Sequence, residues 1–245
     1  MQLLVVGAGE MGRWFAGQSG ADRIAFADRD PEIAIEAAAE QRRAETVPLD
    51  TEETFEVVCL AVPMSATPAA IETHARRAGE AVVDVCGEMR DAVAALETHV
   101  ESENRACASF HPLFSASNAP GNVPVVVVRG GRTIDRIRSS LEASGNDVFE
   151  TTVEEHDRAM ETVQAKAHTA VLAYALVAED VDSRFQTALS EPLSELAEGL
   201  TGNTPDVYAE IQTRFDGSAS VAEAAAEIAA ADHGTFVDLY EEAGE

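Results

Sequence analysis

A glycine-rich turn near the start of the sequence is the first feature with chemical meaning. Gly7, Gly9 and Gly12 form the pattern GxGxxG after the apolar run Leu3–Val6, and a segment with helical periodicity follows. In this pattern the first glycine makes a tight turn, the second lets the backbone approach a pyrophosphate, and the third lets helix and strand pack closely. The helix N-terminus then faces the phosphates, so the pattern predicts a dinucleotide site.

An acidic residue after the second apolar run indicates which dinucleotide to expect. Asp28 lies 21 positions after Gly7 and can accept hydrogen bonds from the adenosine ribose hydroxyls, which favours NAD. Arg29 could instead bind a 2′-phosphate, so NADP stays open. The turn and its acidic partner give the expected cofactor-binding residues Gly7, Gly9, Glu10, Met11, Gly12, Asp28 and Arg29. The alternative is a glycine-rich turn that binds no ligand.

The charge balance is strongly acidic. The chain has 44 Asp and Glu against 17 Lys and Arg, a net charge of −27, and Lys166 is its only lysine. Such a field repels nucleic acid and anionic membranes, so neither is an expected partner. The carboxylates interleave with a normal apolar content of 46%, which favours a folded protein over a disordered tail. We expect a halophilic protein whose carboxylate-rich surface stays hydrated in molar salt.

The sequence carries no sign of export, membrane insertion or metal binding. No apolar run approaches the roughly 18 residues of a membrane-spanning helix. The first residues lead directly into a strand, without a basic segment or a cleavage site, so we expect a soluble, cytoplasmic protein. Cys59, Cys86 and Cys107 are odd in number and lack CxxC spacing, which predicts buried thiols rather than a disulfide framework or a metal site.

The elements that position the glycine turn alternate between apolar runs and amphipathic stretches over residues 1–150. This alternation predicts a Rossmann-type, doubly wound α/β sheet with helices on both faces. The expected strands are Gln2–Val6, Arg23–Ala27, Val57–Val62, Ala81–Val85, Ala106–Ser109 and Pro124–Val128. The expected helices are Met11–Ser19, Pro31–Gln41, Pro68–Ala78, Asp91–Val100 and Thr133–Ser144.

Residues 151–245 read as a smaller, all-α domain, with the boundary near residues 146–153. The domain opens with the capping-box pattern Thr152-x-x-Glu155. An apolar stripe follows on its first helix, formed by Met160, Val163, Ala167, Ala170, Val171 and Tyr174. Further helices are expected near Arg184–Gly199, Pro205–Phe215 and Val221–Tyr240.

Several segments together resemble the prephenate and arogenate dehydrogenase family, and the resemblance covers most of the chain. The segments are GAGEMG at residues 7–12, ADRD after the second strand, Ala61–Pro63, DVCGEMR at Asp84–Arg90, FHPLF at Phe110–Phe114, EEHD at Glu154–Asp157 and NTPDVYAEI at Asn203–Ile211. The resemblance implies a haloarchaeal-like member of this family of oxidoreductases of tyrosine biosynthesis. It adds Ala61, Val62 and Pro63 to the expected cofactor-binding residues.

The resemblance also implies two catalytic histidines. His111-Pro112 resembles the HPxxG signature of the family, and His168 matches its second histidine. Oxidation of the ring alcohol of prephenate requires a group that accepts the hydroxyl proton while hydride leaves for the nicotinamide, a role that suits histidine. Loss of the ring carboxylate as CO2 then gives 4-hydroxyphenylpyruvate. His111 could instead stabilise a turn, and His168 could be a satisfied helix histidine.

The substrate carries two carboxylates, which require cations or oriented backbone amides. Arg90 and Lys166 are the substrate-binding candidates, and Arg158 and Arg214 are weaker ones. Members of this family form dimers through the helical domain, so the resemblance implies a homodimer.

The chain departs from the family pattern at three positions. Gly87 replaces a common serine, Ser115 replaces the last glycine of HPxxG, and Ala209 follows Tyr208 where an arginine is usual. The sequence therefore leaves several alternatives open. These are an arogenate dehydrogenase, a β-hydroxyacid dehydrogenase that uses Lys166, an F420-linked NADP reductase and a non-catalytic regulatory protein that binds the cofactor.

Overall fold

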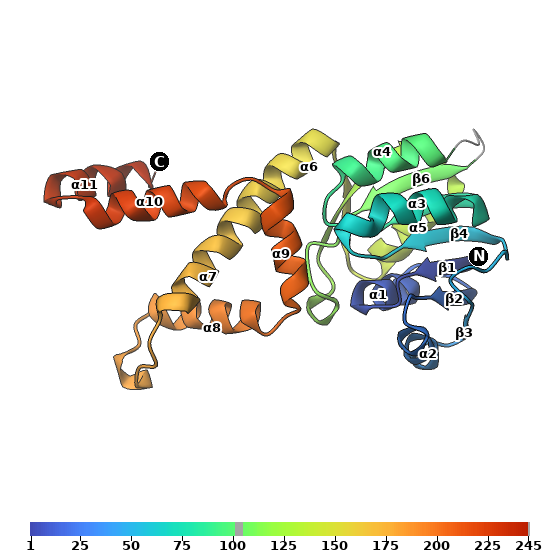
Figure 1. The fold of residues 1–245 in the computed structure, drawn as a ribbon, viewed down its shortest axis with the longest axis horizontal. Helices are drawn as coiled ribbons and strands as arrows, with labels where there is room; N and C mark the ends of the chain where they lie inside the picture. The colour runs from blue at the N-terminus through green and yellow to red at the C-terminus, as the bar shows by residue number, and fades with distance from the viewer. Residues whose placement is uncertain (101–104, 245) are drawn as a thin grey trace. The chain divides into compact units, whose positions relative to one another are not determined.

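The computed structural model describes residues 1–100 and 105–244, and it divides into two compact units, residues 1–157 and 158–245 (Figure 1). In the described part of the first unit, eight strands form one sheet of order β3-β2-β1-β4-β5-β6-β7-β8. The strands are β1 (Gln2–Val6), β2 (Arg23–Ala27), β3 (Ala44–Thr46), β4 (Phe55–Leu60), β5 (Ala78–Asp84), β6 (Ala106–Phe110), β7 (Asn122–Arg129) and β8 (Asp147–Glu150).

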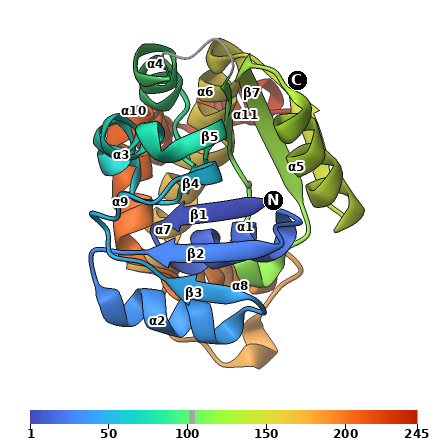
Figure 2. The same ribbon diagram turned by 90° about the vertical axis from the view of Figure 1, so that its right-hand side faces the viewer.

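Neighbouring strands are parallel except for β6 and β7, which are antiparallel. Helices cover both faces of this sheet (Figure 2). They are α1 (Glu10–Gln18), α2 (Pro31–Glu40), α3 (Thr67–His74), α4 (Arg90–His99) and α5 (Arg132–Ala143). The α/β class predicted from the sequence, a Rossmann-type sheet followed by a helical region, is confirmed.

The central strands are apolar on both sides because each side meets a layer of helices. Leu3 and Val5 of β1 belong to a buried cluster that includes Phe15 of α1 and Ile137 of α5. Side chains alternate across a strand, so the fully buried Leu4 points to the opposite face, where α3 and α4 pack. Figure 2 shows α5 on one side of the sheet and α3 and α4 on the other. The continuous apolar runs in the sequence are thus explained by burial on two faces.

The predicted strands agree with β1 and β2 and differ elsewhere at their ends. The predicted Val57–Val62 extends past β4, which ends at Leu60, although Ala61 still donates its backbone N–H to the Val6 carbonyl. The expected strands also lack the two edge strands, β3 of three residues and β8 of four. All three cysteines are buried and free, as predicted.

The described part of the second unit is helical, and its first helix begins in the first unit. The helices are α6 (Val153–Met160), a π-helical segment (Glu161–Lys166), α7 (Ala167–Val177), α8 (Ser190–Thr201), α9 (Pro205–Arg214), α10 (Ser218–Ala230) and α11 (His233–Glu242). Among the described residues, no helix is both long and apolar enough to cross a membrane.

One helical prediction in this region is wrong. The single helix expected at Val221–Tyr240 is broken into α10 and α11, because the Asp232 side chain accepts a hydrogen bond from the Thr235 N–H and starts a new helix. The apolar stripe lies mostly at the surface of this unit. Of its six members only Met160 is buried, and Val163 is 54% exposed. A π-helical segment, Glu161–Lys166, interrupts the stripe.

Candidate active site

The order of the strands gathers the predicted residues of the first unit at one edge of the sheet. The chain order reverses between β1 and β4, and in such sheets ligands bind beyond the carboxyl ends of the strands at this point. The glycine turn follows β1, Ala61–Pro63 follows β4, the segment Val85–Met89 follows β5, and His111 follows β6. Four loops that are distant in sequence therefore share one edge.

The three glycines have different surroundings. Gly7 has a φ of +96°, and a Cβ there would lie 2.3 Å from the Ala61 carbonyl oxygen. A Cβ on Gly12 would lie 2.0 Å from the Gly7 carbonyl oxygen. A Cβ on Gly9 would meet nothing within 4 Å. Packing therefore requires Gly7 and Gly12, whereas Gly9 leaves an open backbone surface at the N-terminus of α1, as a bound pyrophosphate needs.

Asp28 is held against this turn. One oxygen of its carboxylate accepts the Ala8 N–H at 2.7 Å, and the other accepts the Asp30 N–H at 2.9 Å. A carboxylate has about four acceptor sites, so these two bonds leave capacity for ribose hydroxyls. The Arg29 side chain beside it is exposed. The residues after β2 thus fit the ribose end of a dinucleotide.

The loop that carries His111 is attached to the first turn of α1. The Glu10 carboxylate accepts the Ala116 N–H at 2.6 Å, and the Phe114 ring packs edge-on against Trp14 with ring centroids 5.3 Å apart. The His111 N–H donates to the Pro124 carbonyl at 3.0 Å, which extends the pairing of β6 and β7. These contacts hold the histidine loop beside the glycine turn.

The His111 imidazole is buried, with 6% of the residue exposed. Its Nδ1 lies 2.8 Å from Nε2 of His156, and the two rings meet edge-on at an interplanar angle of 65°. Its Nε2 faces Gly87, where a Cβ would lie 3.5 Å away. Burial, with His156 as a second cause, lowers the pKa of His111 to about 3. The ring is therefore neutral at physiological pH, the form in which imidazole accepts a proton.

His156 is positioned by the start of α6. Thr152 Oγ1 accepts the Glu155 N–H at 3.1 Å, the main bond of the predicted capping box. The Glu155 carboxylate accepts a hydrogen bond from the Thr151 hydroxyl at 3.1 Å. His156 lies one residue further along, in the first turn, and is 2% exposed.

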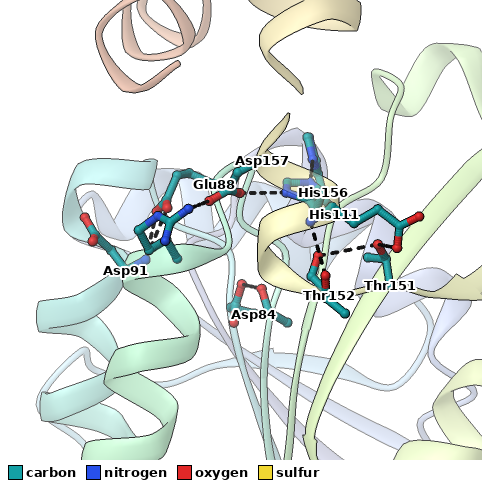
Figure 3. Close-up of polar contacts among 11 residues, drawn as sticks. Asp84, Glu88, Asp91, His111, Thr151, Thr152, His156 and Asp157 are labelled. Atoms are coloured by element: carbon teal, nitrogen blue, oxygen red, sulfur yellow. Dashed lines mark hydrogen bonds and ion pairs between the residues drawn. The ribbon is translucent and has the colours of Figure 1, made fainter. Parts of the chain in front are cut away.

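The polar contacts continue beyond His156 toward the surface (Figure 3). His156 Nδ1 lies 2.9 Å from Asp157 Oδ1, and a guanidinium nitrogen of Arg90 lies 3.4 Å from Asp157 Oδ2. Arg90, predicted to bind substrate, is 60% exposed in its side chain. The structure thus joins Arg90, Asp157, His156 and His111 in one row of contacts.

A second carboxyl group lies below this row. Asp84, at the end of β5, accepts hydrogen bonds from the Ser109 hydroxyl at 2.8 Å and the Cys86 N–H at 3.1 Å. Its second oxygen is buried without a hydrogen-bond partner among the described residues. Burial raises the pKa of Asp84 to about 7, although both hydrogen bonds act in the opposite direction. Asp84 thereby links the segment that carries Gly87 to the strand that leads to His111.

Sequence reasoning did not identify His156, Asp157 or Asp84 as site residues. The signal for the first two was present, since EEHD directly follows a capping threonine and places a histidine and an acid together in a first helical turn. The signal for Asp84 was weaker, a single carboxylate at the end of an apolar strand. Only the fold brings His156 into contact with His111, and Asp84 into contact with Ser109 on the strand that leads to it.

The predicted residues of the second unit are His168 and Lys166. His168 packs edge-on against Tyr208 of α9 with ring centroids 4.9 Å apart, and burial lowers its pKa. Its Nδ1 is buried without a hydrogen-bond partner among the described residues. The aliphatic stem of Lys166 packs against Gly217. Their roles in binding or catalysis stay predictions.

Comparisons with known proteins find dehydrogenases. Residues 2–87 match the family model described as NADP oxidoreductase, coenzyme F420-dependent. The chain is 28% identical over 186 residues to the 4-amino-4-deoxyprephenate dehydrogenase of Streptomyces pristinaespiralis, a match that covers 69% of this chain. The match spans 60% of the length of that curated relative.

Solved structures extend the comparison to both units. The prephenate dehydrogenase of Aquifex aeolicus, in complex with hydroxyphenyl propionate and NAD+, matches with a TM-score of 0.69 and 17% identity over 91% of this chain and 86% of that one. The chain has the fold of the prephenate dehydrogenases. Synechocystis arogenate dehydrogenase matches with a TM-score of 0.60 and 16% identity over 100% of this chain and 98% of that one. The resemblance seen in the motifs is thus confirmed.

Proposed function

We propose that this protein is an NAD-dependent dehydrogenase that oxidises and decarboxylates prephenate, with His111 as the base. The observation that carries the proposal is the position of His111. Its neutral imidazole follows β6, and its loop is bonded to the first turn of the glycine-rich helix through Glu10 and Ala116. A base and a dinucleotide turn at the same sheet edge are the two parts that a dehydrogenase of this type requires.

The residues around the turn fit a nicotinamide dinucleotide. Gly9 and the N-terminus of α1 would hold the pyrophosphate, and Asp28 would bind the adenosine ribose. The carboxylate favours NAD over NADP, whose 2′-phosphate would have to rely on the exposed Arg29. Val62 and Pro63, after β4, would border the nicotinamide half. When bound, the oxidised cofactor supplies the hydride acceptor.

The proposed chemistry assigns one proton to His111. The ring hydroxyl of the substrate donates a hydrogen bond to Nε2, and its proton moves to this nitrogen as hydride leaves the carbinol carbon. The ring carboxylate then departs as CO2, and its bonding electrons complete the aromatic ring. The absence of a Cβ at Gly87 leaves space between the Met64 side chain and Nε2 of His111, which supports approach by the substrate hydroxyl.

Arg90 is the proposed partner for a substrate carboxylate. Its exposed guanidinium forms the end of the row of contacts opposite His111, where it lies 3.4 Å from Asp157. In a chain of net charge −27, an arginine at the site lowers the local repulsion of a dianionic substrate. Lys166 and His168 remain proposed contributors from the helical region.

The decisive assay compares three substrates in molar potassium chloride: prephenate, arogenate and 4-amino-4-deoxyprephenate. The account predicts NAD-dependent absorbance of reduced nicotinamide with prephenate. Turnover of arogenate alone would indicate an arogenate dehydrogenase instead. Turnover of 4-amino-4-deoxyprephenate alone would instead match the activity in the name of the Streptomyces relative. Binding of NAD without turnover of any substrate would support a regulatory protein.

We also propose that the protein is a homodimer formed through its helical unit. Helices α7, α10 and α11 contribute no buried residue, and several of their large apolar side chains are strongly exposed. Leu176 and Val177 of α7 are 78% and 77% exposed, and Tyr240 of α11 is 72% exposed. A second copy of this unit would cover such side chains. Light scattering in molar salt should give twice the monomer mass, and a monomer at micromolar concentration would contradict the proposal.

A further inference from the structure

A buried row of hydrogen-bonding groups joins His111 to a carboxylate. Nδ1 of His111 is 2.8 Å from Nε2 of His156, and Nδ1 of His156 is 2.9 Å from Asp157 Oδ1. His156 and Asp157 are 2% and 9% exposed, so water competes little for these contacts. Each bond requires one donor and one acceptor, which limits where the protons can reside.

The Asp157 carboxylate, at one end of the row, determines where the protons of the two histidines reside. An ionised carboxylate only accepts hydrogen bonds, so the proton between His156 and Asp157 belongs to Nδ1 of His156. When His156 is neutral, this is its only proton, so Nε2 of His156 is an acceptor. The bond between the two rings must then be donated by Nδ1 of His111. The lone pair of His111 consequently resides on Nε2, the nitrogen that faces Gly87.

The charged groups around the row favour this arrangement. The Arg90 guanidinium lies 3.4 Å from the second oxygen of Asp157 and stabilises it as a carboxylate. Glu88 is the nearby acid, and burial, with a smaller contribution from Asp91 and Asp157, raises its pKa. The carboxylate at the end of the row is therefore the charged acceptor that the two rings require.

We propose that His156 and Asp157 are positioning residues that hold His111 as its Nδ1–H tautomer, so that Nε2 is the atom that accepts the substrate proton. The tautomer itself is a property of the free protein, whereas its catalytic consequence rests on the proposed function. In water a free imidazole rotates and exchanges its proton between the two ring nitrogens. Here His156, itself held by Asp157, orients the ring before the substrate arrives.

The same row stabilises His111 after it accepts the proton. Burial makes an isolated imidazolium costly at this position, which is why the pKa of His111 is lowered to about 3. Once Nε2 is protonated, Nδ1–H still donates to His156, which in turn donates to the carboxylate of Asp157. A negative charge one ring away offsets part of the cost, as in other histidines oriented by a buried acid.

The first test reads the tautomer directly. Nitrogen chemical shifts of the 15N-histidine-labelled protein at pH 7 distinguish a protonated from an unprotonated ring nitrogen. We expect His111 to have a protonated Nδ1 and an unprotonated Nε2, without any substrate present. An Nε2–H tautomer, or an imidazolium, would overturn the proposal. The result is independent of turnover, so a protein with the expected tautomer and no activity on prephenate would overturn the proposed function alone.

The second test separates positioning from structure. His156→Phe removes the acceptor, whereas His156→Gln retains a carboxamide oxygen that can accept the His111 proton. We expect His156→Phe to lower kcat at least about tenfold with KM little changed, and His156→Gln to recover most of the loss. Glu154→Gln, an exposed neighbour on α6, is the matched control and should leave kcat unchanged. Equal kcat values for His156→Phe and the wild type would contradict the proposal.

Discussion

The two units of this protein differ in how completely each buries its own apolar residues. In the first, strand and helix residues such as Leu3, Phe15 and Leu141 are fully buried in one cluster under the sheet. In the second, the described parts of α7, α10 and α11 bury none of their residues, and Leu176 is 78% exposed. The first unit therefore has a well-buried core that supports the site, whereas α7, α10 and α11 leave much of their apolar surface exposed.

Replacement of His111 should separate the catalytic role of the first unit from its binding of NAD. Replacement by Asn keeps a polar side chain of similar size but removes the base, so we expect kcat to fall about 10²- to 10⁴-fold. Binding of NAD, measured by the shift in Tm, should persist because the glycine turn is intact. His233→Asn, at an exposed position on α11, is the control and should change neither quantity. Loss of NAD binding together with kcat would mean that His111 has a structural role.

Truncation of one leucine in each unit tests the contrast in burial. Leu141→Ala removes a side chain with 0% exposure and should cost about 2–5 kcal/mol of unfolding free energy. Leu176→Ala should change the unfolding free energy of a monomer by no more than about 0.5 kcal/mol. Urea titrations at several protein concentrations give both values. A cost at Leu176 that grows with protein concentration would sharpen the comparison, because it places this side chain in a dimer interface.

Asp84 makes the stability of the first unit depend on pH. Its pKa is raised from 3.8 to about 7 in the folded protein, so the folded state binds the extra proton in this range. Its contribution to stability is therefore complete below pH 4 and is lost as the pH rises toward 7, with a slope of up to about 1.4 kcal/mol per pH unit. Asp84→Asn should flatten this part of the profile, measured by urea unfolding in molar salt between pH 4.5 and 7.5. An unchanged slope would contradict the assignment.

The smallest predicted effect concerns the middle glycine of the turn. Because a Cβ on Gly9 would meet nothing within 4 Å, Gly9→Ala should leave the Tm of the free protein unchanged. It should weaken NAD binding about tenfold or more, because the methyl group would occupy the backbone surface that a pyrophosphate approaches. Gly199→Ala, at an equally open position on α8, should leave the affinity for NAD unchanged. Unchanged NAD affinity in Gly9→Ala would place the cofactor elsewhere.

The sheet and the glycine turn of the first unit could be predicted because each depends on residue types that are neighbours in the sequence. Two-sided burial of β1 requires an uninterrupted apolar run, and the close approach of Gly7 to Ala61 excludes any side chain. Both requirements are visible in the residue types. The break between α10 and α11 also has a local signal, the capping pair Asp232 and Thr235. The alanine-rich run before this pair favours a continuous helix, so the break was not predicted.

The row of contacts behind His111 was not predictable in the same way. His156 follows His111 by 45 residues and reaches it only because β7, α5 and β8 return the chain to the same edge of the sheet. Its chemistry also depends on burial, since an exposed histidine pair would not fix a tautomer. The spacing of the two histidines in the sequence indicates neither their contact nor their burial. The π-helical segment after α6 was invisible for a related reason, because it depends on packing rather than on a residue type.

The central claim is that the imidazole of His111 and the glycine turn belong to a single site. Titration of NAD into the 15N-histidine-labelled protein tests this claim directly, with the buried His74 of α3 as an internal reference. The account predicts that saturation with NAD shifts the ring resonances of His111 and leaves those of His74 in place. Binding of NAD that leaves the His111 resonances unmoved would contradict it.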